Sequence, residues 1–285
     1  MRRVIGVITA RMASTRCPGK VLKKLGDKSI FERHVERMKQ VQGLNGVFLA
    51  TSTDPLNEAL IQEAKRLECG WFSGAEQDVV DRHIQLCQQE KADAVIRVTC
   101  DSPIFDIEST SCLVEAFKKE YWDFGCVSNM TMIQGTLTEL ISLEALKEVH
   151  KHHRGPAVTL HIKENPSQFK MLNILLEHDL CRPEYRLTID EPADIEMIDL
   201  VYRALDKGSP LSLRTVYTWL DDNPQVAKIN RHVGVKECEQ LSAHLTEMPT
   251  FSVVRSGKKF VILDEQKRMI EPEEFMETIK EMFTL

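Results

Sequence analysis

The first half of the chain alternates short apolar runs with stretches whose apolar residues recur at helical spacing. Continuous apolar runs predict buried strands at residues 4–8, 46–51, 71–72 and 94–99. The stretches between them predict amphipathic helices over residues 29–40, 56–67 and 76–90. Because buried strands that alternate with helices cannot each cover their own faces, this order predicts an α/β fold, with a mostly parallel sheet and helices on both faces.

The pattern is less regular in the second half. We expect helices over 107–119, 143–152, 158–164, 195–205 and 212–220, and strands over 124–128, 169–175 and 186–189. Residues 129–142 are expected to form a loop or a β-hairpin. Beyond His232 the character changes, and two strands (250–254 and 260–263) and a helix (272–283) are expected. We therefore predict a main domain over residues 1–234 and a small C-terminal α+β appendage over residues 235–285.

Composition narrows the class of protein. The 285 residues are 42% hydrophobic and 28% charged, which suits a globular chain with one large core. The net charge of −6 argues against nonspecific nucleic-acid binding. The first apolar run is too short for a signal peptide or a membrane span. No two of the eight cysteines have C-x-x-C spacing, which argues against a structural zinc site and a thioredoxin-like motif. Since no signal peptide or membrane span is predicted, we expect a cytoplasmic protein with reduced thiols and neither membrane nor nucleic-acid partners.

A basic loop of small residues follows the first strand. It reads TARMASTRCPGK over residues 9–20 and carries Arg11, Arg16 and Lys20. Small side chains let backbone amides approach phosphate groups, and the three cations neutralise their charge. The loop has neither the G-x-x-x-x-G-K-[ST] nor the G-x-G-x-x-G pattern. The alternative is an ordinary surface turn with solvated arginines.

Two aspartates follow apolar runs that we predict to be strands. Asp101 follows IRVTC and Asp190 follows RLTI, and each has a proline within two residues. Because ligands of parallel sheets bind beyond the carboxyl ends of the strands, we expect both carboxylates to face the basic loop across one crevice. A pair of carboxylates beside a polyphosphate is typical of a Mg²⁺ site. The alternative is that each aspartate only caps the helix that follows it.

These segments resemble a known family. The loop is similar to that of the cytidylyltransferases that make CMP-activated acidic sugars, such as the CMP-KDO and CMP-sialate synthetases. The resemblance is closer to the spore-coat polysaccharide biosynthesis protein F branch and extends over about residues 3–225. The segments that carry it are Ala50-Thr51-Ser52, Asp78-Val79-x-Asp81-Arg82, Arg97-x-Thr99-x-Asp101-x-Pro103 and Arg186-Leu187-Thr188-x-Asp190-x-Pro192-x-Asp194.

The resemblance implies a Rossmann-like nucleotide-diphospho-sugar transferase fold and a Mg²⁺-dependent transfer of CMP from CTP to a small anionic acceptor. The acceptor would be an acidic sugar, pyrophosphate would be released, and the product would serve surface polysaccharide synthesis. Arg11, Arg16 and Lys20 would be catalytic, and Asp101 and Asp190 would ligate the metal. The implied nucleotide-binding residues are Ala10, Arg11, Met12, Ala13, Ser14, Arg16, Lys20, Thr51, Ser52, Asp78, Arg82 and Thr99, and the implied acceptor-binding residues are Asn129, Glu139 and Arg186.

The chain departs from this branch in the region expected to meet the acceptor. Relatives often carry a P-x-G-x-D-x-E segment, whereas this chain keeps Gly135 and Glu139 but has Leu137 in place of the aspartate. Two other functions therefore stay open: a glycosyltransferase that uses a nucleotide-sugar, and a catalytically silent nucleotide-binding protein. Since relatives are often dimers, a homodimer through Asn129–Ser142 is also expected.

Overall fold

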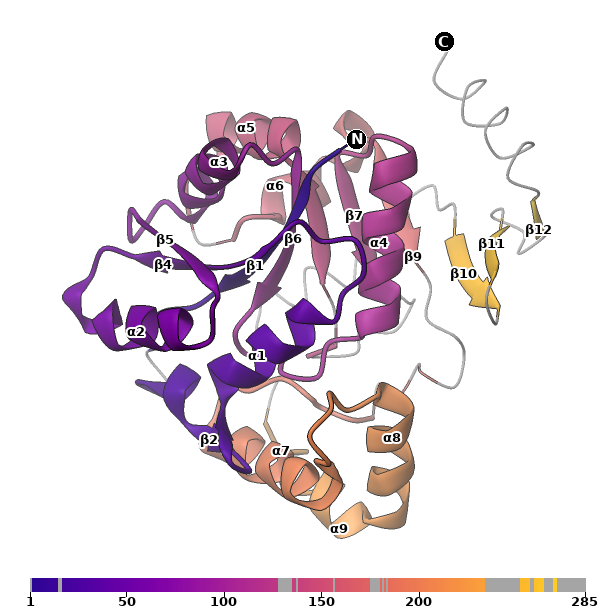
Figure 1. The fold of residues 1–285 in the computed structure, drawn as a ribbon. Helices are drawn as coiled ribbons and strands as arrows, with labels where there is room; N and C mark the ends of the chain where they lie inside the picture. Colours follow the sequence, from indigo (N-terminus) through magenta and orange to yellow (C-terminus); the bar gives the residue numbers. More distant parts are fainter. Residues whose placement is uncertain are drawn as a thin grey trace.

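The computed structural model describes residues 2–14, 17–127, 135–136, 138–155, 157–174, 180, 182 and 184–233, and three later strands. One mixed sheet has the strand order β12-β11-β10-β9-β7-β8-β6-β1-β4-β5 (Figure 1). At its centre, β1 (Val4–Thr9) runs parallel to β4 (Val47–Ser52) and β6 (Ala94–Thr99), and β5 (Gly70–Gly74) continues the parallel order beyond β4. The predicted α/β sheet is confirmed.

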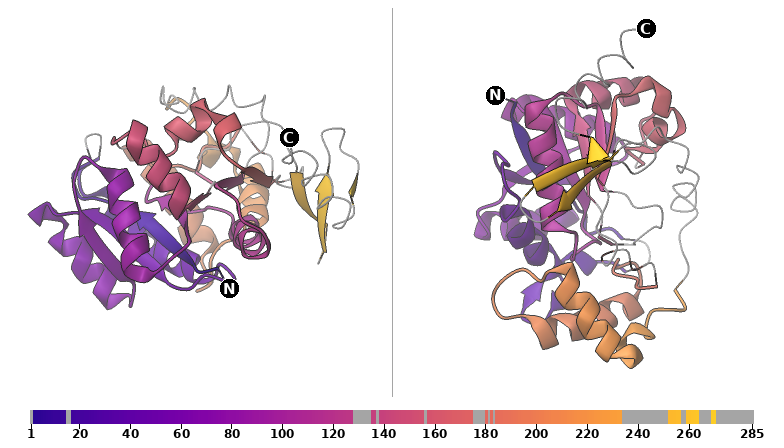
Figure 2. Two further views of the ribbon diagram at one scale, coloured as in Figure 1. Left: turned by 90° about the horizontal axis from the view of Figure 1, so that it is seen from above. Right: turned by 90° about the vertical axis from the view of Figure 1, so that its right-hand side faces the viewer.

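The other half of the sheet is mixed. β8 (Glu139–Ser142) runs antiparallel between β6 and β7 (Phe124–Val127), and β9 (Met171–Ile174) is parallel to β7. Beyond β9 lie β10 (Ser252–Ser256), β11 (Lys259–Leu263) and β12 (Met269–Ile270). β10 pairs with β9 in parallel, so the C-terminal strands extend the sheet at the edge far from β5 (Figure 2). A separate unit over residues 235–285 stays a prediction, and the helix expected over 272–283 lies outside the described residues.

Helices cover both faces of the sheet, and each face has its own apolar core. On one face pack α3 (Val79–Glu90), α5 (Leu143–His152) and α6 (Leu160–Glu164). On the other pack α1 (Ile30–Lys39), α2 (Glu58–Arg66) and α4 (Ile107–Lys119). α7 (Pro192–Leu205), α8 (Leu213–Asp222) and α9 (Pro224–Ala227) pack against one another and add side chains to the same apolar core. A short hairpin, β2 (Lys24–Leu25) and β3 (Lys28–Ser29), contacts α7.

Side-chain caps set several helix boundaries. Ser29 accepts from the Glu32 amide at the start of α1, and Asp106 accepts from the Ser109 amide at the start of α4. α3 begins at Val79, three residues later than expected, because Asp78 caps it by accepting from the Asp81 amide. α2 likewise begins at Glu58, after a single 3-10 turn over Pro55–Asn57.

One predicted strand is wrong. Residues 186–189 form no strand, although their apolar alternation resembles one. The Ile189 amide donates to the Asp101 carbonyl at 2.7 Å, in the turn that follows β6. The segment therefore meets the end of a strand and does not run beside one, so it cannot form a ladder.

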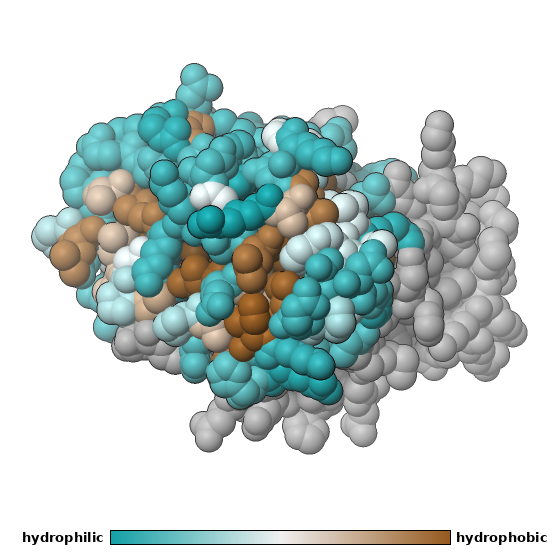
Figure 3. Space-filling view, turned by 90° about the horizontal axis from the view of Figure 1, so that it is seen from below, coloured by the Kyte–Doolittle hydropathy of each residue, from teal (hydrophilic) through white to brown (hydrophobic). Residues whose placement is uncertain are grey.

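The surface and the helices give two further results. No helix of the described chain is both long and apolar enough to cross a bilayer. The face drawn in Figure 3 is mostly hydrophilic, with apolar residues in small separate areas. The large exposed apolar side chains of the described residues are Leu56, Trp71 and Leu200. Isolated apolar side chains of this kind are ordinary on protein surfaces.

The mixed half of the sheet buries a group of charges. Glu139 on β8 lies opposite Arg97 on β6, and its Oε2 accepts from Arg97 Nη1 at 2.7 Å. Its Oε1 accepts from Lys163 Nζ on α6 at 2.9 Å and from Thr159 Oγ1 at 3.0 Å. Burial opposes the charge on Glu139, but Lys163 and Arg97 outweigh it and lower the pKa of the carboxyl to about 2.

Gly135 provides a first test of the fold, because it touches the backbone that carries Asp190. It has φ +88, and an added Cβ would lie 2.2 Å from the Leu187 carbonyl carbon and 2.3 Å from the Thr188 nitrogen. Backbone cannot rotate away, so Gly135→Ala should lower the free energy of unfolding by roughly 2–5 kcal/mol. Gly208→Ala is the matched control, since Gly208 has φ +87 and open space around its Cβ. Urea unfolding should show about 1–2 kcal/mol there; equal losses in the two variants would contradict the close approach.

Glu139 predicts an acid dependence of stability. A carboxyl whose pKa is lowered in the folded state stabilises the fold above its unfolded pKa of 4.5, and this stabilisation is lost as the pH falls toward 2. Urea unfolding of wild type and Glu139→Gln should therefore differ by roughly 2–3 kcal/mol at pH 6 and converge toward pH 2. Glu148→Gln, at an exposed ion pair on α5, should follow wild type across the range. A constant difference between wild type and Glu139→Gln would contradict the assignment.

Candidate active site

A cleft of about 400 Å³ opens at the carboxyl ends of β1 and β6. The loop after β1 lines one wall, with Ala10, Arg11, Ala13, Ser14 and Lys20. The end of β6 and Asp190 line another part, and the residues around the start of α3, Glu76, Gln77, Val79 and Arg82, complete it. Its volume is in the range of small-molecule sites. Residues of the basic loop, Asp101 and Asp190 all line it, as the sequence predicts.

Strand alternation explains why polar groups gather here. β1 and β6 are paired in register, with Thr9 opposite Thr99 and Val7 opposite Arg97. Side chains two residues apart share a face, so Arg97, Thr99 and Asp101 follow one another along the same side of the chain. On that side Val95 and Val7 belong to the apolar core under α3 and α5, whereas the residues nearer the carboxyl ends are polar. The core therefore gives way to the cleft along two strands.

The loop after β1 is held by a buried asparagine. Asn57 Oδ1 accepts from the Met12 amide at 2.8 Å, while Asn57 Nδ2 donates to the Ser52 Oγ at 2.8 Å. The loop then closes on itself, because the Gly19 amide donates to the Met12 carbonyl at 2.9 Å. Gly19 has φ +67, the left-handed region that favours glycine. No motif pointed to Asn57, which follows Pro55 at the start of a helix.

Lys20 reaches across the cleft from the end of this loop. Its Nζ donates to the Ile189 carbonyl and lies 3.8 Å from Asp190 Oδ1. The Lys20 side chain is 12% exposed and the Asp190 side chain 2%. The ammonium therefore balances a buried carboxylate in the described structure and stands at the boundary between the loop and residue 190.

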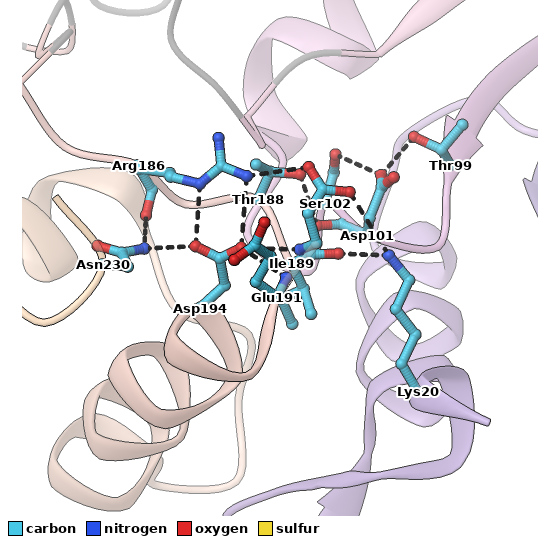
Figure 4. Close-up of polar contacts among 11 residues, drawn as sticks. Lys20, Thr99, Asp101, Ser102, Arg186, Thr188, Ile189, Glu191, Asp194 and Asn230 are labelled. Carbon is cyan, nitrogen blue, oxygen red and sulfur yellow. Dashed lines mark hydrogen bonds and ion pairs between the residues drawn. The ribbon is translucent and has the colours of Figure 1, made fainter. Parts of the chain in front are cut away.

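Asp101 and the segment before Asp190 are joined through the backbone (Figure 4). The Asp101 carbonyl accepts from the Ile189 amide at 2.7 Å and from Thr188 Oγ1 at 3.3 Å. The Asp101 carboxylate uses Oδ1 to accept from Thr99 Oγ1 at 2.5 Å and from Ser102 Oγ at 3.3 Å. The carboxylates thus belong to neighbouring segments, although Asp190 does not follow a strand.

A buried ion-pair network orients Asp190 (Figure 4). Arg186 donates from Nη2 to Asp190 Oδ2 and from Nε to Asp194 Oδ1, both at 2.9 Å. Asp194 Oδ2 accepts from the Asp190 amide at 2.8 Å, and Asn230 Nδ2 donates to Asp194 Oδ1 at 2.9 Å. Burial opposes the charge on Arg186, but the two carboxylates raise its pKa. Arg186, predicted to bind the acceptor, therefore lies against Asp190 and Asp194 and is not among the described residues that line the cleft.

The remaining predicted nucleotide residues separate into two groups. Arg11 and Arg82 line the cleft; Arg11 lies 3.7 Å from Glu76, and Arg82 Nη2 donates to the Ala75 carbonyl at 2.7 Å. Burial lowers the pKa of Arg82, with the charge of Arg11 acting in the same direction. Thr51, Ser52 and Asp78 are not among the described lining residues: the first two are buried beneath the loop, and Asp78 caps α3 and pairs with His150 at 2.9 Å.

Two predicted site residues, Arg16 and Asn129, lie outside the described residues. So do seven of the fourteen residues of the interface expected at 129–142, and the homodimer stays a prediction. Among the residues that the structure describes, no group of three or more His, Cys, Asp or Glu side chains is arranged to hold a metal ion. Asp101 and Asp190 are a pair of carboxylates, which suits an ion that draws its other oxygen ligands from a substrate.

The chain is similar to known proteins over most of its length. A family model described as cytidylyltransferase matches residues 5–242. The spore coat polysaccharide biosynthesis protein SpsF of Bacillus subtilis is 29% identical over 240 residues, which are 80% of this chain and 98% of that protein. A 3-deoxy-manno-octulosonate cytidylyltransferase of Christiangramia forsetii is 26% identical over 125 residues, 41% of this chain and 47% of that protein.

A solved structure agrees with the fold. The structure of a cytidylyltransferase from Leptospira borgpetersenii has a TM-score of 0.74 and 23% sequence identity, over 83% of this chain and 100% of that chain. The family match spans the whole cleft, from the loop after β1 through Asp101 to Asp190. The chain therefore belongs to the cytidylyltransferase family and is a nucleotidyltransferase.

Proposed function

We propose that this chain transfers CMP from CTP to an acidic sugar and releases pyrophosphate. An acceptor oxygen attacks the α-phosphorus of CTP, the bond from that phosphorus to the pyrophosphate oxygen breaks, and the acceptor hydroxyl loses its proton. The observation that carries the proposal is the meeting of Lys20, Asp101 and Asp190 in one cleft beside a loop of small residues. The family match and the activity for which the Christiangramia relative is named support cytosine and a sugar acid.

The loop after β1 would bind the triphosphate. Ala13 and Ser14 leave space for phosphate groups near the backbone, and Arg11 and Lys20 supply positive charge. Lys20 Nζ lies 3.8 Å from Asp190 Oδ1, beside the proposed metal site. Its ammonium can therefore stabilise charge on the transferring and leaving phosphates. Catalysis in this arrangement is positioning and charge neutralisation, and the protein needs no covalent intermediate.

Asp101 and Asp190 would hold Mg²⁺. Carboxylate oxygens are the ligands this ion prefers, and one or two of them commonly suffice when phosphate oxygens complete the shell. Of the two carboxylate oxygens of Asp101, Oδ1 accepts hydrogen bonds from described residues and Oδ2 accepts none from them, which leaves Oδ2 for an ion. When bound, Mg²⁺ supplies charge neutralisation at the phosphates. Arg186 and Asp194 keep the Asp190 carboxylate oriented for that purpose.

The name of the Bacillus relative supports a role in polysaccharide synthesis, and we extend that role to this chain as part of the proposal. A cytoplasmic location and a homodimer belong to it as expectations from the sequence.

The proposal is tested by measuring pyrophosphate release from each of the four ribonucleoside triphosphates over a panel of sugar acids and neutral sugars. We expect release from CTP in the presence of a sugar acid and Mg²⁺. Release of free nucleotide from a CMP-sugar, with no pyrophosphate from CTP, would identify a glycosyltransferase instead. Thermal stabilisation by CTP with Mg²⁺ but no turnover of any acceptor would identify a silent nucleotide-binding protein.

Asp101→Asn should reduce kcat/KM for CTP by about 100-fold or more, because it removes a metal-binding charge from the cleft. EDTA should abolish pyrophosphate release by wild type, and added Mg²⁺ should restore it. Asp222→Asn is the control, since it removes the same charge from an exposed position at the end of α8. Activity that survives both Asp101→Asn and EDTA would exclude this mechanism.

A further inference from the structure

Arg97 is a cation of the cleft that the expected site residues do not include. It lines the cleft from β6, on the same side of the strand as Thr99 and Asp101. The basic loop follows β1, on one side of β6, whereas β8 and its Glu139 lie on the other side. Arg97 therefore lies on the strand between the basic loop, which follows β1, and Glu139 on β8.

The hydrogen bonds of Arg97 are incomplete. Its Nη1 donates to Glu139 Oε2 at 2.7 Å, and its side chain is 14% exposed. Among the described residues, neither Nε, which is fully buried, nor Nη2 has a hydrogen-bond partner. Since Nε has no surface open to the cleft, Nη2 is the donor that a ligand can reach. A carboxylate oxygen is the acceptor that pairs most strongly with such a fixed cationic donor.

Glu139 positions this guanidinium and is itself fully engaged. Both of its oxygens accept hydrogen bonds, from Arg97, Lys163 and Thr159, so the carboxylate has little capacity for an acceptor sugar. Burial opposes the charge on Lys163, but Glu139 raises its pKa. The group of Arg97, Glu139 and Lys163 therefore carries two positive charges and one negative charge.

His83 on the neighbouring α3 adds no charge to this group, although Arg82 of the same helix also lines the cleft. His83 lies beneath the cleft, with Nδ1 bonded to the Val79 carbonyl at 2.7 Å and Nε2 to Thr9 Oγ1 at 3.2 Å. Burial, and then the charge of Arg97, lower the pKa of His83 to about 3, so the imidazole is neutral near pH 7. The excess positive charge at Arg97 is thus available to an anion in the cleft.

We propose that Arg97 binds the carboxylate of the acceptor sugar through its Nη2, and that Glu139 is a positioning residue for Arg97. This rests on the proposed function and deepens it, because it names the group that selects an acidic acceptor. Glu139, predicted to bind the acceptor, acts through Arg97 and does not contact the sugar.

The test compares acceptors that differ only in the charge of one group. The probes are 3-deoxy-manno-octulosonate, 8-amino-3,8-dideoxy-manno-octulosonate and N-acetylneuraminate, each beside its carboxamide, with pyrophosphate release as the readout. For the acid that wild type uses, Arg97→Gln should raise the acceptor KM by roughly 10- to 100-fold, the effect of losing a charged hydrogen-bond pair. The KM for the matching carboxamide and the affinity for CTP should stay near wild type.

Two further variants separate recognition from structure. Arg97→Lys keeps the charge but not the planar guanidinium that Glu139 holds in place, so it should recover part of the preference for carboxylate over carboxamide. Glu139→Gln should weaken the same preference, which a purely structural role would leave unchanged. Arg66→Gln is the matched control, since Arg66 is exposed on α2 and paired with Glu32 and Glu63. It should leave both KM values at wild type.

The outcomes distinguish this inference from the proposed function. Pyrophosphate release that is equal for acid and carboxamide in wild type, or unchanged by Arg97→Gln, overturns the role of Arg97 alone. A loss of CTP affinity in Arg97→Gln, with acceptor preference intact, also overturns it. Absence of turnover with all six compounds overturns the proposed function, and the inference falls with it.

Discussion

The main-chain carbonyl of Asp101 accepts hydrogen bonds from the Ile189 amide and the Thr188 hydroxyl, and the second partner lies 87 residues away in the chain. These bonds fix the end of β6 against the segment that leads to Asp190. Without them the two carboxylates would belong to independent loops, and their separation would vary with each. The Lys20 ammonium completes the junction by donating to the Ile189 carbonyl. Loop, strand end and carboxylate segment therefore meet at a single point.

Electrostatics explains why Asp190 needs more support than Asp101. The Asp190 side chain is 2% exposed, and a buried carboxylate is costly unless cations and hydrogen bonds compensate it. Arg186 and Lys20 supply that compensation, and Asp194 holds Arg186 in place. Asp101 is only half-buried and receives hydroxyl donors instead of a cation. Asp190 is thus held in place and neutralised, while Asp101 keeps one carboxylate oxygen that accepts no hydrogen bond from the described residues, an asymmetry that suits a site completed by its substrate.

The sequence predicted the elements that depend on local pattern. Apolar runs identified the central strands, and helical spacing identified α1 and α4 to within one residue at each end. It failed at 186–189, because alternation describes a buried face and cannot say which backbone the segment meets. Asp190 nevertheless lies at the expected edge of the sheet, because the segment before it contacts the turn after β6. Asn57 was missed because its role depends on Met12 and Ser52, which only the folded chain brings together.

The acceptor region illustrates the same limit. This region departs from related sequences, for example at Leu137. If Glu139 contacted the sugar, these departures would weigh against an acidic acceptor. The contacts of Glu139 change that reasoning, because a carboxylate bound to Arg97, Lys163 and Thr159 serves the protein's own charges. What the chain keeps at this position is the support for a cation in the cleft. Differences in sequence within residues 129–138 can then alter the shape of the acceptor that fits, while the demand for a negative charge, set by Arg97 on a central strand, persists.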